Sequence, residues 1–337
     1  MSSPSETPRA RGAHDPWPPL PLDAAWSATR DTLHMWSQIV GKTVLASAPP
    51  SNHWWHVALR IASRGLVTPP LPHGDRLFEV AFDFFSHQLH VTANDGATRS
   101  LPLGPQTVAE FYQAYRQALR ELDLDVPMWP HPVEVAPAIP FADDREHRTY
   151  DPASVERFWQ IILQTDRVFQ EFRGRFLGKA SPIHFFWGGF DLAYTRFSGR
   201  TAPLHPGGVP HVGNWVMHEA YSHEVSSAGF WPGNEASGGA AFYAYAYPEP
   251  EGYSTYAVRP SEAFYHPEMR EFLLPYDRMR EAAHPDDLLI DFLQTTYEAA
   301  ADRARWDRAA LDRATPLATP PPRSTSTTRA ASSPDRA

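Results

Sequence analysis

The sequence predicts an α+β fold in which two helix–antiparallel sheet–helix units form one compact body. Four segments have helical periodicity, and the strand-like segments between them come in runs instead of alternating with helices. Runs of strands framed by helices are typical of a mainly antiparallel sheet. The second half of the chain also repeats features of the first. With 337 residues, 42% of them hydrophobic and 13% aromatic, the chain has ample material for a core of this kind.

Four helices are predicted from apolar residues that recur at three- and four-residue intervals. They cover about residues 23–40, 106–122, 151–178 and 285–300. We expect Gly41 and Gly178 to end the first and third helices, because glycine commonly terminates a helix. Asp151 followed by Pro152 is a favourable start for the third helix, and the acidic pair after Pro285 suits the start of the fourth.

Strands are predicted in two groups, one between the first two helices and one between the last two. The first group comprises an aromatic segment at residues 53–59 and a hairpin in which alternating residues 78–84 are followed by residues 89–91. The second group covers residues 184–197, 220–231 and 241–250. In the middle segment, Tyr221 and His223 would share one face and Glu224 the other.

An internal repeat is visible in the order of these features. Residues 39–42 read Ile-Val-Gly-Lys and residues 176–179 read Phe-Leu-Gly-Lys, each at the end of a predicted helix. A histidine heads an aromatic segment in both halves, at His53 and His184. We infer a duplication that divides the chain into units at residues 16–140 and 141–313; chance similarity between proline-rich loops is the alternative. An interface between two units is a common place for a pocket.

Composition excludes several classes of protein. A formal net charge of −9 argues against a nucleic-acid binder, and the absence of cysteine excludes disulfides and thiolate chemistry. No apolar run is long enough to cross a membrane, and residues 1–15 do not form a secretory signal. We expect a cytoplasmic protein with disordered tails at residues 1–15 and 314–337, the latter rich in Pro, Ser and Thr. The oligomeric state stays open.

Several strings in the second half carry a resemblance to a known family. They are the segment from Ser181 to Arg200, the segment from His218 to Gly233 and the run FYAYAYPEPEGY, together with NHWWHVALRIASRGLVT in the first half. These strings resemble the bacterial domain-of-unknown-function family 5996, and the resemblance covers nearly the whole folded region. That family has no established reaction, substrate or cofactor. The resemblance therefore implies one coherent protein and supplies no catalytic residues.

Polar and aromatic residues crowd the second half, and we take nine of them as the candidate site. Burying a charged residue without a partner is costly, so such residues usually pair or serve a site. The Gly188-Gly189 pair beside them indicates a bend or a close approach by another group. The nine candidates are His184, Trp187, Asp191, Arg196, Arg200, Tyr221, His223, Glu224 and Trp231.

In this hypothesis Arg196 and Arg200 hold an anionic group, and Trp187 and Trp231 stack on the ligand. Along the extended segment, His184 and Arg196 would share one face. An ion pair of Asp191 with either arginine is the structural alternative, and plain core packing is the alternative for the aromatic residues.

The acid–base candidate is His223, supported by Glu224 or Tyr221. His218 and His223 are five residues apart, which is the wrong spacing for the zinc-binding helix motif that their segment superficially resembles. We assign no metal ligands and no cofactor.

From these observations we expect a small-molecule site at the junction of the two units, for an anionic or aromatic ligand. The sequence leaves open whether the ligand is only bound or also converted. A non-enzymatic scaffold or interaction protein is one alternative, and a metal-dependent hydrolase is another.

Overall fold

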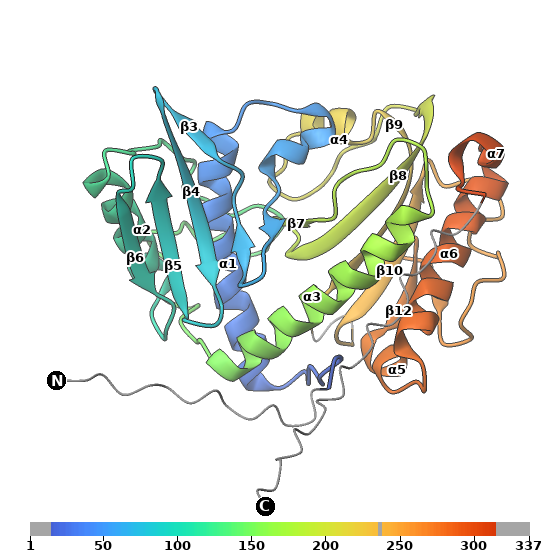
Figure 1. Cartoon of the computed structure of the whole chain (residues 1–337), viewed down its shortest axis with the longest axis horizontal. Helices are drawn as coiled ribbons and strands as arrows, with labels where there is room; N and C mark the ends of the chain where they lie inside the picture. Colours follow the sequence, from blue (N-terminus) through green and yellow to red (C-terminus); the bar gives the residue numbers. More distant parts are fainter. Residues whose placement is uncertain (1–14, 235–237, 315–337) are drawn as a thin grey trace, which may run out of the picture.

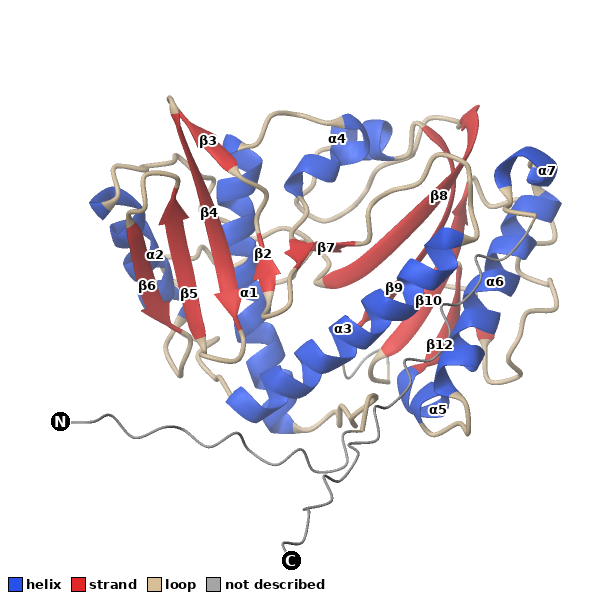
Figure 2. Cartoon of the chain, viewed as in Figure 1, coloured by secondary structure: helices blue, strands red, loops and turns tan. Residues whose placement is uncertain are grey.

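The computed structural model describes residues 15–234 and 238–314 of the chain (Figures 1 and 2). The predicted tails lie outside these residues, apart from Asp15 and Ala314. In chain order the elements are α1 (Ala24–Ser47), the 3₁₀ segment η1 (Asn52–Val57), β1 (Arg60–Ile61), β2 (Leu66–Val67), β3 (Leu71–His73), β4 (Arg76–Asp83), β5 (Gln88–Ala93), β6 (Thr98–Pro102), α2 (Val108–Glu121), α3 (Pro152–Gly174), β7 (His184–Phe186), β8 (Asp191–Thr201), α4 (Asn214–Ala220), β9 (His223–Trp231), β10 (Ala241–Tyr247), β11 (Phe264–His266), β12 (Glu271–Pro275), α5 (Tyr276–Arg280), α6 (Pro285–Arg303) and α7 (Arg308–Leu311).

The strands form two antiparallel sheets, which confirms the α+β class. The first sheet has the order β1-β2-β4-β5-β6, with β3 also paired to β4, and the second has the order β11-β12-β10-β9-β8-β7. Each half of the chain thus runs from a long helix through six strands to a further long helix. This order is what a duplication would produce; the duplication and its boundaries stay a prediction.

The two sheets are joined edge to edge at one point. Leu59, directly before β1, and Phe185 in β7 exchange two backbone hydrogen bonds, each 2.9 Å long. Figure 2 shows β7 lying between the two sheets at this junction. Because β1 and β7 are the first strands of their halves, the junction brings equivalent positions of the two halves together.

Aromatic side chains pack the long helices together. Trp36 of α1 stacks on Phe111 of α2 with ring centroids 4.8 Å apart, and Trp26 lies 5.3 Å from Phe158 of α3. The ring of Phe158 in turn stacks on Phe190, directly before β8. Large apolar side chains at helical spacing thus produce one continuous core between the sheets and helices. None of the helices within the described residues combines the length and apolarity needed to cross a membrane.

Three local predictions are wrong. The first helix does not end at Gly41 but continues to Ser47, and the third ends at Gly174 instead of Gly178. Residues 52–57 are not a strand, because His53 and Trp54 adopt positive φ angles of 57° and 63°. The ring of His53 packs against Phe197 at 4.5 Å, and its Nδ1 hydrogen-bonds the carbonyl of Ala220 at 3.0 Å, so tertiary contacts override the strand propensity of the segment.

Position 41 lies inside the helix, and a side chain larger than that of glycine has no room there. A Cβ atom built on Gly41 would overlap the ring of Trp187, which is itself fixed by a 2.8 Å hydrogen bond from its Nε1 to the carbonyl of Val57. The glycine therefore serves close packing of α1 against the second half of the chain, not helix termination.

We expect Gly41→Ala to lower the free energy of unfolding by about 1–3 kcal/mol, the usual cost of overpacking a core. This loss would occur although alanine favours helix by about 1 kcal/mol over glycine. Chemical denaturation measures the change. Gly104→Ala is the matched control, because a Cβ at Gly104 meets no atom within 4 Å. Equal stability of the Gly41 variant and the wild type would contradict this account of the packing.

Candidate functional site

The second sheet has one apolar and one polar face. Leu192, Phe230, Phe242 and Leu274 form a row across four strands and are fully buried on the side covered by α3 and α6 (Figure 1). The register places the adjacent residues on the opposite side. We call that side the polar face, and its polar side chains are Asp191, Thr195, Ser227, Tyr243, Tyr245 and Glu271.

A tyrosine crosses the polar face to reach a carboxylate two strands away. Tyr243 of β10 lies opposite Gly229 of β9, and a Cβ on Gly229 would overlap the tyrosine ring. The hydroxyl of Tyr243 donates a short hydrogen bond to Oδ2 of Asp191 in β8. The absence of a side chain at Gly229 thus allows this contact.

A second carboxylate comes from the first half of the chain. Glu134, in the loop after α2, has a left-handed backbone with φ of 60°, and its carboxylate lies against Gly188. A Cβ built on Gly189 would be 3.0 Å from Oδ1 of Asp191 and 3.6 Å from Oε2 of Glu134. The two carboxylates are therefore neighbours above the Gly188-Gly189 turn. The close approach expected for these glycines is that of Glu134.

The loop that carries Glu134 is held by hydrogen bonds at Glu134 and at the residue before it. The side-chain amide of Gln38, fully buried in α1, donates to the carbonyl of Val133 and accepts from its N–H, both at 2.8 Å. The N–H of Glu134 itself donates to the carbonyl of Pro210 at 2.9 Å. A strained backbone conformation held by such contacts is typical of functional sites.

Asp191, Glu134 and Glu271 form what we call the carboxyl cluster. Burial raises the pKa of Asp191 to about 6, against the hydrogen bond from Tyr243, which lowers it. Desolvation and then the charge of Asp191 raise the pKa of Glu134 and that of Glu271 to about 7 each. Glu134 is exposed as a residue, but its carboxylate lies against the Gly188 turn; Asp191 and Glu271 are partly buried. The cluster therefore exchanges protons near neutral pH, as groups in acid–base sites do.

Hydrogen-bond donors are scarce around this cluster. Among the residues that the structure describes, Tyr243 is the one side chain that donates to it, and the carboxyls of Glu134 and Glu271 have no hydrogen-bond partner. Nearby, the hydroxyls of Tyr221 and Tyr245 bond each other at 2.7 Å, and those of Thr195 and Ser227 do so at 2.9 Å. The polar face thus presents acceptors that the protein does not satisfy.

Helix α1 adds two nitrogen-containing side chains beside the cluster. His34 bonds the carbonyl of Gly188 through Nε2 at 2.8 Å, and burial lowers its pKa to about 4, so its ring stays neutral. Lys42 is 3% exposed, with Nζ 5.5 Å from the centroid of the Trp187 ring. Burial lowers the pKa of Lys42 to about 8, although the charge of Glu134 opposes the shift.

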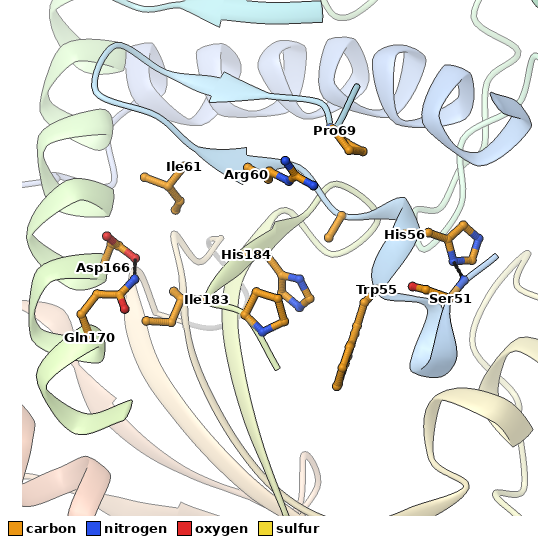
Figure 3. A pocket seen from close by; sticks show the side chains of 12 residues that line it. Ser51, Trp55, His56, Arg60, Ile61, Pro69, Asp166, Gln170, Ile183 and His184 are labelled. Carbon is orange, nitrogen blue, oxygen red and sulfur yellow. Dashed lines mark hydrogen bonds between the residues drawn. The ribbon is translucent and has the colours of Figure 1, made fainter. Parts of the chain in front are cut away.

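A cavity of about 390 Å³ lies at the junction of the two halves, and its lining does not include the residues of the carboxyl cluster (Figure 3). Arg60, Trp55 and His56 line it from the first half, and Asp166 of α3 and His184 of β7 line it from the second. His184 is 4% exposed, and burial lowers its pKa to about 4.

The structure brings only some of the predicted site residues together. Asp191 is in the carboxyl cluster, and the ring centroid of Trp187 lies 5.5 Å from Nζ of Lys42. The charge of Asp191 also acts on Tyr221, whose pKa is raised well above 10, first by burial. Trp231 lies at the end of β9 on the polar face of the sheet. His184 lines the cavity at the junction of the two halves.

The remaining predicted residues lie apart from the cluster. Arg196 is 1% exposed on the apolar side, with its guanidinium 3.5 Å from the centroid of the Phe172 ring and 4.4 Å from that of Tyr297. The prediction that His184 and Arg196 share a face is wrong, because the chain reverses at residues 187–190 and pairs His184 with Ala193.

Two further candidates form an ion pair between the end of β8 and the start of β9. Arg200 donates to Glu224 at 2.6 Å and to the carbonyl of Ala304, beside an open cavity of about 510 Å³. The alternative hypothesis paired Asp191 with Arg196 or Arg200. In the structure the ion pair of Arg200 is made with Glu224 and not with Asp191.

The predicted strand geometry around His223 is also partly wrong. Tyr221 ends helix α4 and does not belong to β9, which begins at His223. The Nδ1 of His223 hydrogen-bonds the hydroxyl of Ser222 at 3.0 Å, and its ring lies 5.5 Å from that of His53. In the described ranges, no group of three or more His, Asp or Glu side chains is arranged to hold a metal ion.

Sequence reasoning missed Lys42, Glu134, Tyr243, Tyr245 and Glu271. The alternation of tyrosine with small or apolar residues over 241–247 was a usable signal, because it marks a strand with one polar face. Lys42 is one of only two lysines in the chain, which also could have singled it out. Glu134 lies in a proline-rich loop with no pattern to reveal it.

The raised pKa of Glu271 predicts how stability depends on pH. The native state holds a proton that the unfolded chain loses near pH 4.5, so the stabilisation is present below that pH and lost as pH rises through about 7. Glu271→Gln removes this loss. We expect the variant to gain about 1–3 kcal/mol relative to the wild type between pH 5 and pH 8, at ~1.4 kcal/mol per pKa unit.

Urea denaturation at the two pH values measures this gain. Glu268→Gln is the control, because Glu268 is exposed in the turn before β12. An identical pH response of the Glu271 variant and the wild type would refute the raised pKa.

Comparison with known proteins adds a family but no activity. Residues 17–313 match the model of a family of unknown function, DUF5996, which spans both sheets and the whole site described above. No curated protein and no solved structure matches the chain. Since the match covers most of the chain, the protein belongs to the DUF5996 family.

Proposed function

We propose that this protein binds a small polar molecule at the junction of its two halves, on the polar face of the second sheet. The observation that supports the proposal is the carboxyl cluster, in which Tyr243 donates to Asp191 and no described side chain donates to Glu134 or Glu271. Buried and half-buried acceptors are normally satisfied by donors. A ligand that brings hydroxyl or amino groups would supply the missing donors.

The ligand class differs from the anionic one expected from the sequence. The guanidinium of Arg196 is enclosed by aromatic rings, and that of Arg200 is paired with Glu224, so neither faces the carboxyl cluster. An anion would be repelled by the cluster, whereas a neutral polyol or an amine would not. Tyrosine rings on β10 offer an apolar surface on which a sugar-like or aromatic ring can lie.

Acid–base chemistry on such a ligand is within reach of the site. Carboxyls with a pKa of about 6 to 7 can both accept and donate a proton at neutral pH. Asp191, oriented by Tyr243, suits the role of a base, and Glu271 suits the role of an acid.

Thermal shift measurements with three matched sugars test the ligand class. We expect glucosamine or glucose to raise the melting temperature, and glucuronate, which adds a carboxylate to the same ring, to have no effect. Asp191→Asn should abolish the stabilisation and Glu268→Gln should keep it. Stabilisation by glucuronate alone, or stabilisation that survives Asp191→Asn, would reject the proposal. Native mass spectrometry of protein purified from its own host would show whether a retained ligand has the expected donors.

A further inference from the structure

We propose that the cavity at the junction of the two halves is a second binding site, for a small zwitterion with an apolar body, such as an amino acid with an aromatic or aliphatic side chain. Its volume of about 390 Å³ lies within the range of about 300–1,000 Å³ that is typical of small-molecule pockets. The site is separate from the polar face, because no residue of the carboxyl cluster lines it. This second site goes beyond the proposed function and does not rest on it.

The lining of the cavity holds one cation and one anion. They are Arg60 of β1 and Asp166 of α3. The two histidines of the lining, His56 and His184, have neutral rings at pH 7, because burial lowers the pKa of each. In the part of the chain that the structure describes, no ion pair within 4.0 Å includes Arg60 or Asp166. A ligand that carries both charges would complement the two of them.

The two charges occupy different places in the cavity. Figure 3 shows Asp166 at one end, His56 at the other end, and Arg60 between them. The acceptor end thus belongs to α3, whereas the cation comes from β1 in the first half of the chain. We expect the ammonium group of the ligand to lie toward Asp166 and its carboxylate to lie toward Arg60 and His56.

The backbone fixes the proton of His56 at the donor end. The N–H of Ser51 donates to Nδ1 of His56 at 3.1 Å, a bond that Figure 3 shows as a dashed line. Because an N–H group can only donate, Nδ1 is the acceptor and the neutral ring carries its proton on Nε2. Nε2 of His56 and the guanidinium of Arg60 are therefore both donors, and a carboxylate is bound by groups of this kind.

The carboxylate at the other end has room for a further donor. Gln170 donates to Oδ1 of Asp166 at 3.1 Å, and within the described ranges no other group donates to this carboxylate. Asp166 is half-buried, and burial raises the pKa of its carboxyl. An ammonium group at Oδ2 would supply both a donor and a compensating positive charge.

Apolar side chains lie between the polar groups. Ile61 of β1 and Ile183, directly before β7, line the cavity together with the ring of Trp55. The ring of Trp55 packs against His53 at 5.2 Å and against Phe197 at 5.7 Å, so these neighbours hold its position. An aliphatic or aromatic side chain of the ligand would be removed from water on this surface.

Isothermal titration calorimetry on the full-length protein with three matched ligands tests the proposal. Phenylalanine carries both charges, phenylalanine amide lacks the carboxylate, and hydrocinnamate lacks the ammonium group. We expect phenylalanine to bind at least about tenfold more tightly than either analogue, since each analogue loses one charged hydrogen-bonding group. This comparison uses the wild-type protein, so it holds even if a variant fails to fold.

Two variants locate the binding site. Arg60→Gln should weaken the binding of phenylalanine at least about tenfold and abolish the preference over phenylalanine amide. Asp166→Asn should abolish the preference over hydrocinnamate. Arg148→Gln is the control, because Arg148 is exposed and does not line the cavity, and it should leave the binding of phenylalanine unchanged.

Three results would overturn the proposal. They are the absence of phenylalanine binding, an equal affinity for phenylalanine and either analogue, and a phenylalanine affinity that survives Arg60→Gln. Displacement of bound phenylalanine by excess glucosamine would place the ligand on the polar face and would also overturn the second site. Failure of the sugars to stabilise the protein would instead reject the proposed function and leave the second site standing.

Discussion

Helix α1 packs so closely against the turn at residues 187–190 that no side chain fits at position 41, and the candidate site depends on this contact. Gly41 faces the ring of Trp187, and His34, two turns earlier, bonds the carbonyl of Gly188. Protein interiors are packed to crystal-like density, so the position of the turn follows the position of the helix. Asp191 comes directly after this turn at the start of β8. The first half of the chain thereby sets where a carboxylate of the second half lies.

The chemistry of the site is divided between the halves in the same way. Lys42 and Glu134 come from the first half, whereas Asp191, Tyr243 and Glu271 come from the second. Desolvation shifts the pKa of Lys42 downward and those of the carboxyls upward, so that all of them approach neutrality. Each shift brings a group toward the pH at which it can exchange a proton.

Much of the fold could be predicted from the sequence, because the spacing of apolar residues in long amphipathic helices and alternating strands marks the face that is buried. The hairpin of β4 and β5 and the helix α2, capped by Thr107 and Glu110, follow local rules. The site could be predicted only in part. Asp191 could be predicted, because a carboxylate in an otherwise aromatic strand usually pairs or serves a site. Glu134 could not, because the position of its loop depends on hydrogen bonds from Gln38, which is far away in the sequence. Arg196 was assigned to a ligand, since the sequence does not reveal the ring of aromatic side chains that encloses it.

The junction of Leu59 with Phe185 has a consequence for the exposed edges of the two sheets. Strands β1 and β7 end their sheets on the sides that meet, and the two backbone hydrogen bonds between Leu59 and Phe185 join these edges at one residue pair. Unpaired strand edges readily recruit strands from other molecules. A fragment containing either half alone would therefore leave unpaired a stretch of strand edge that the intact chain pairs at this point, so the two halves protect one another only while they stay in one polypeptide.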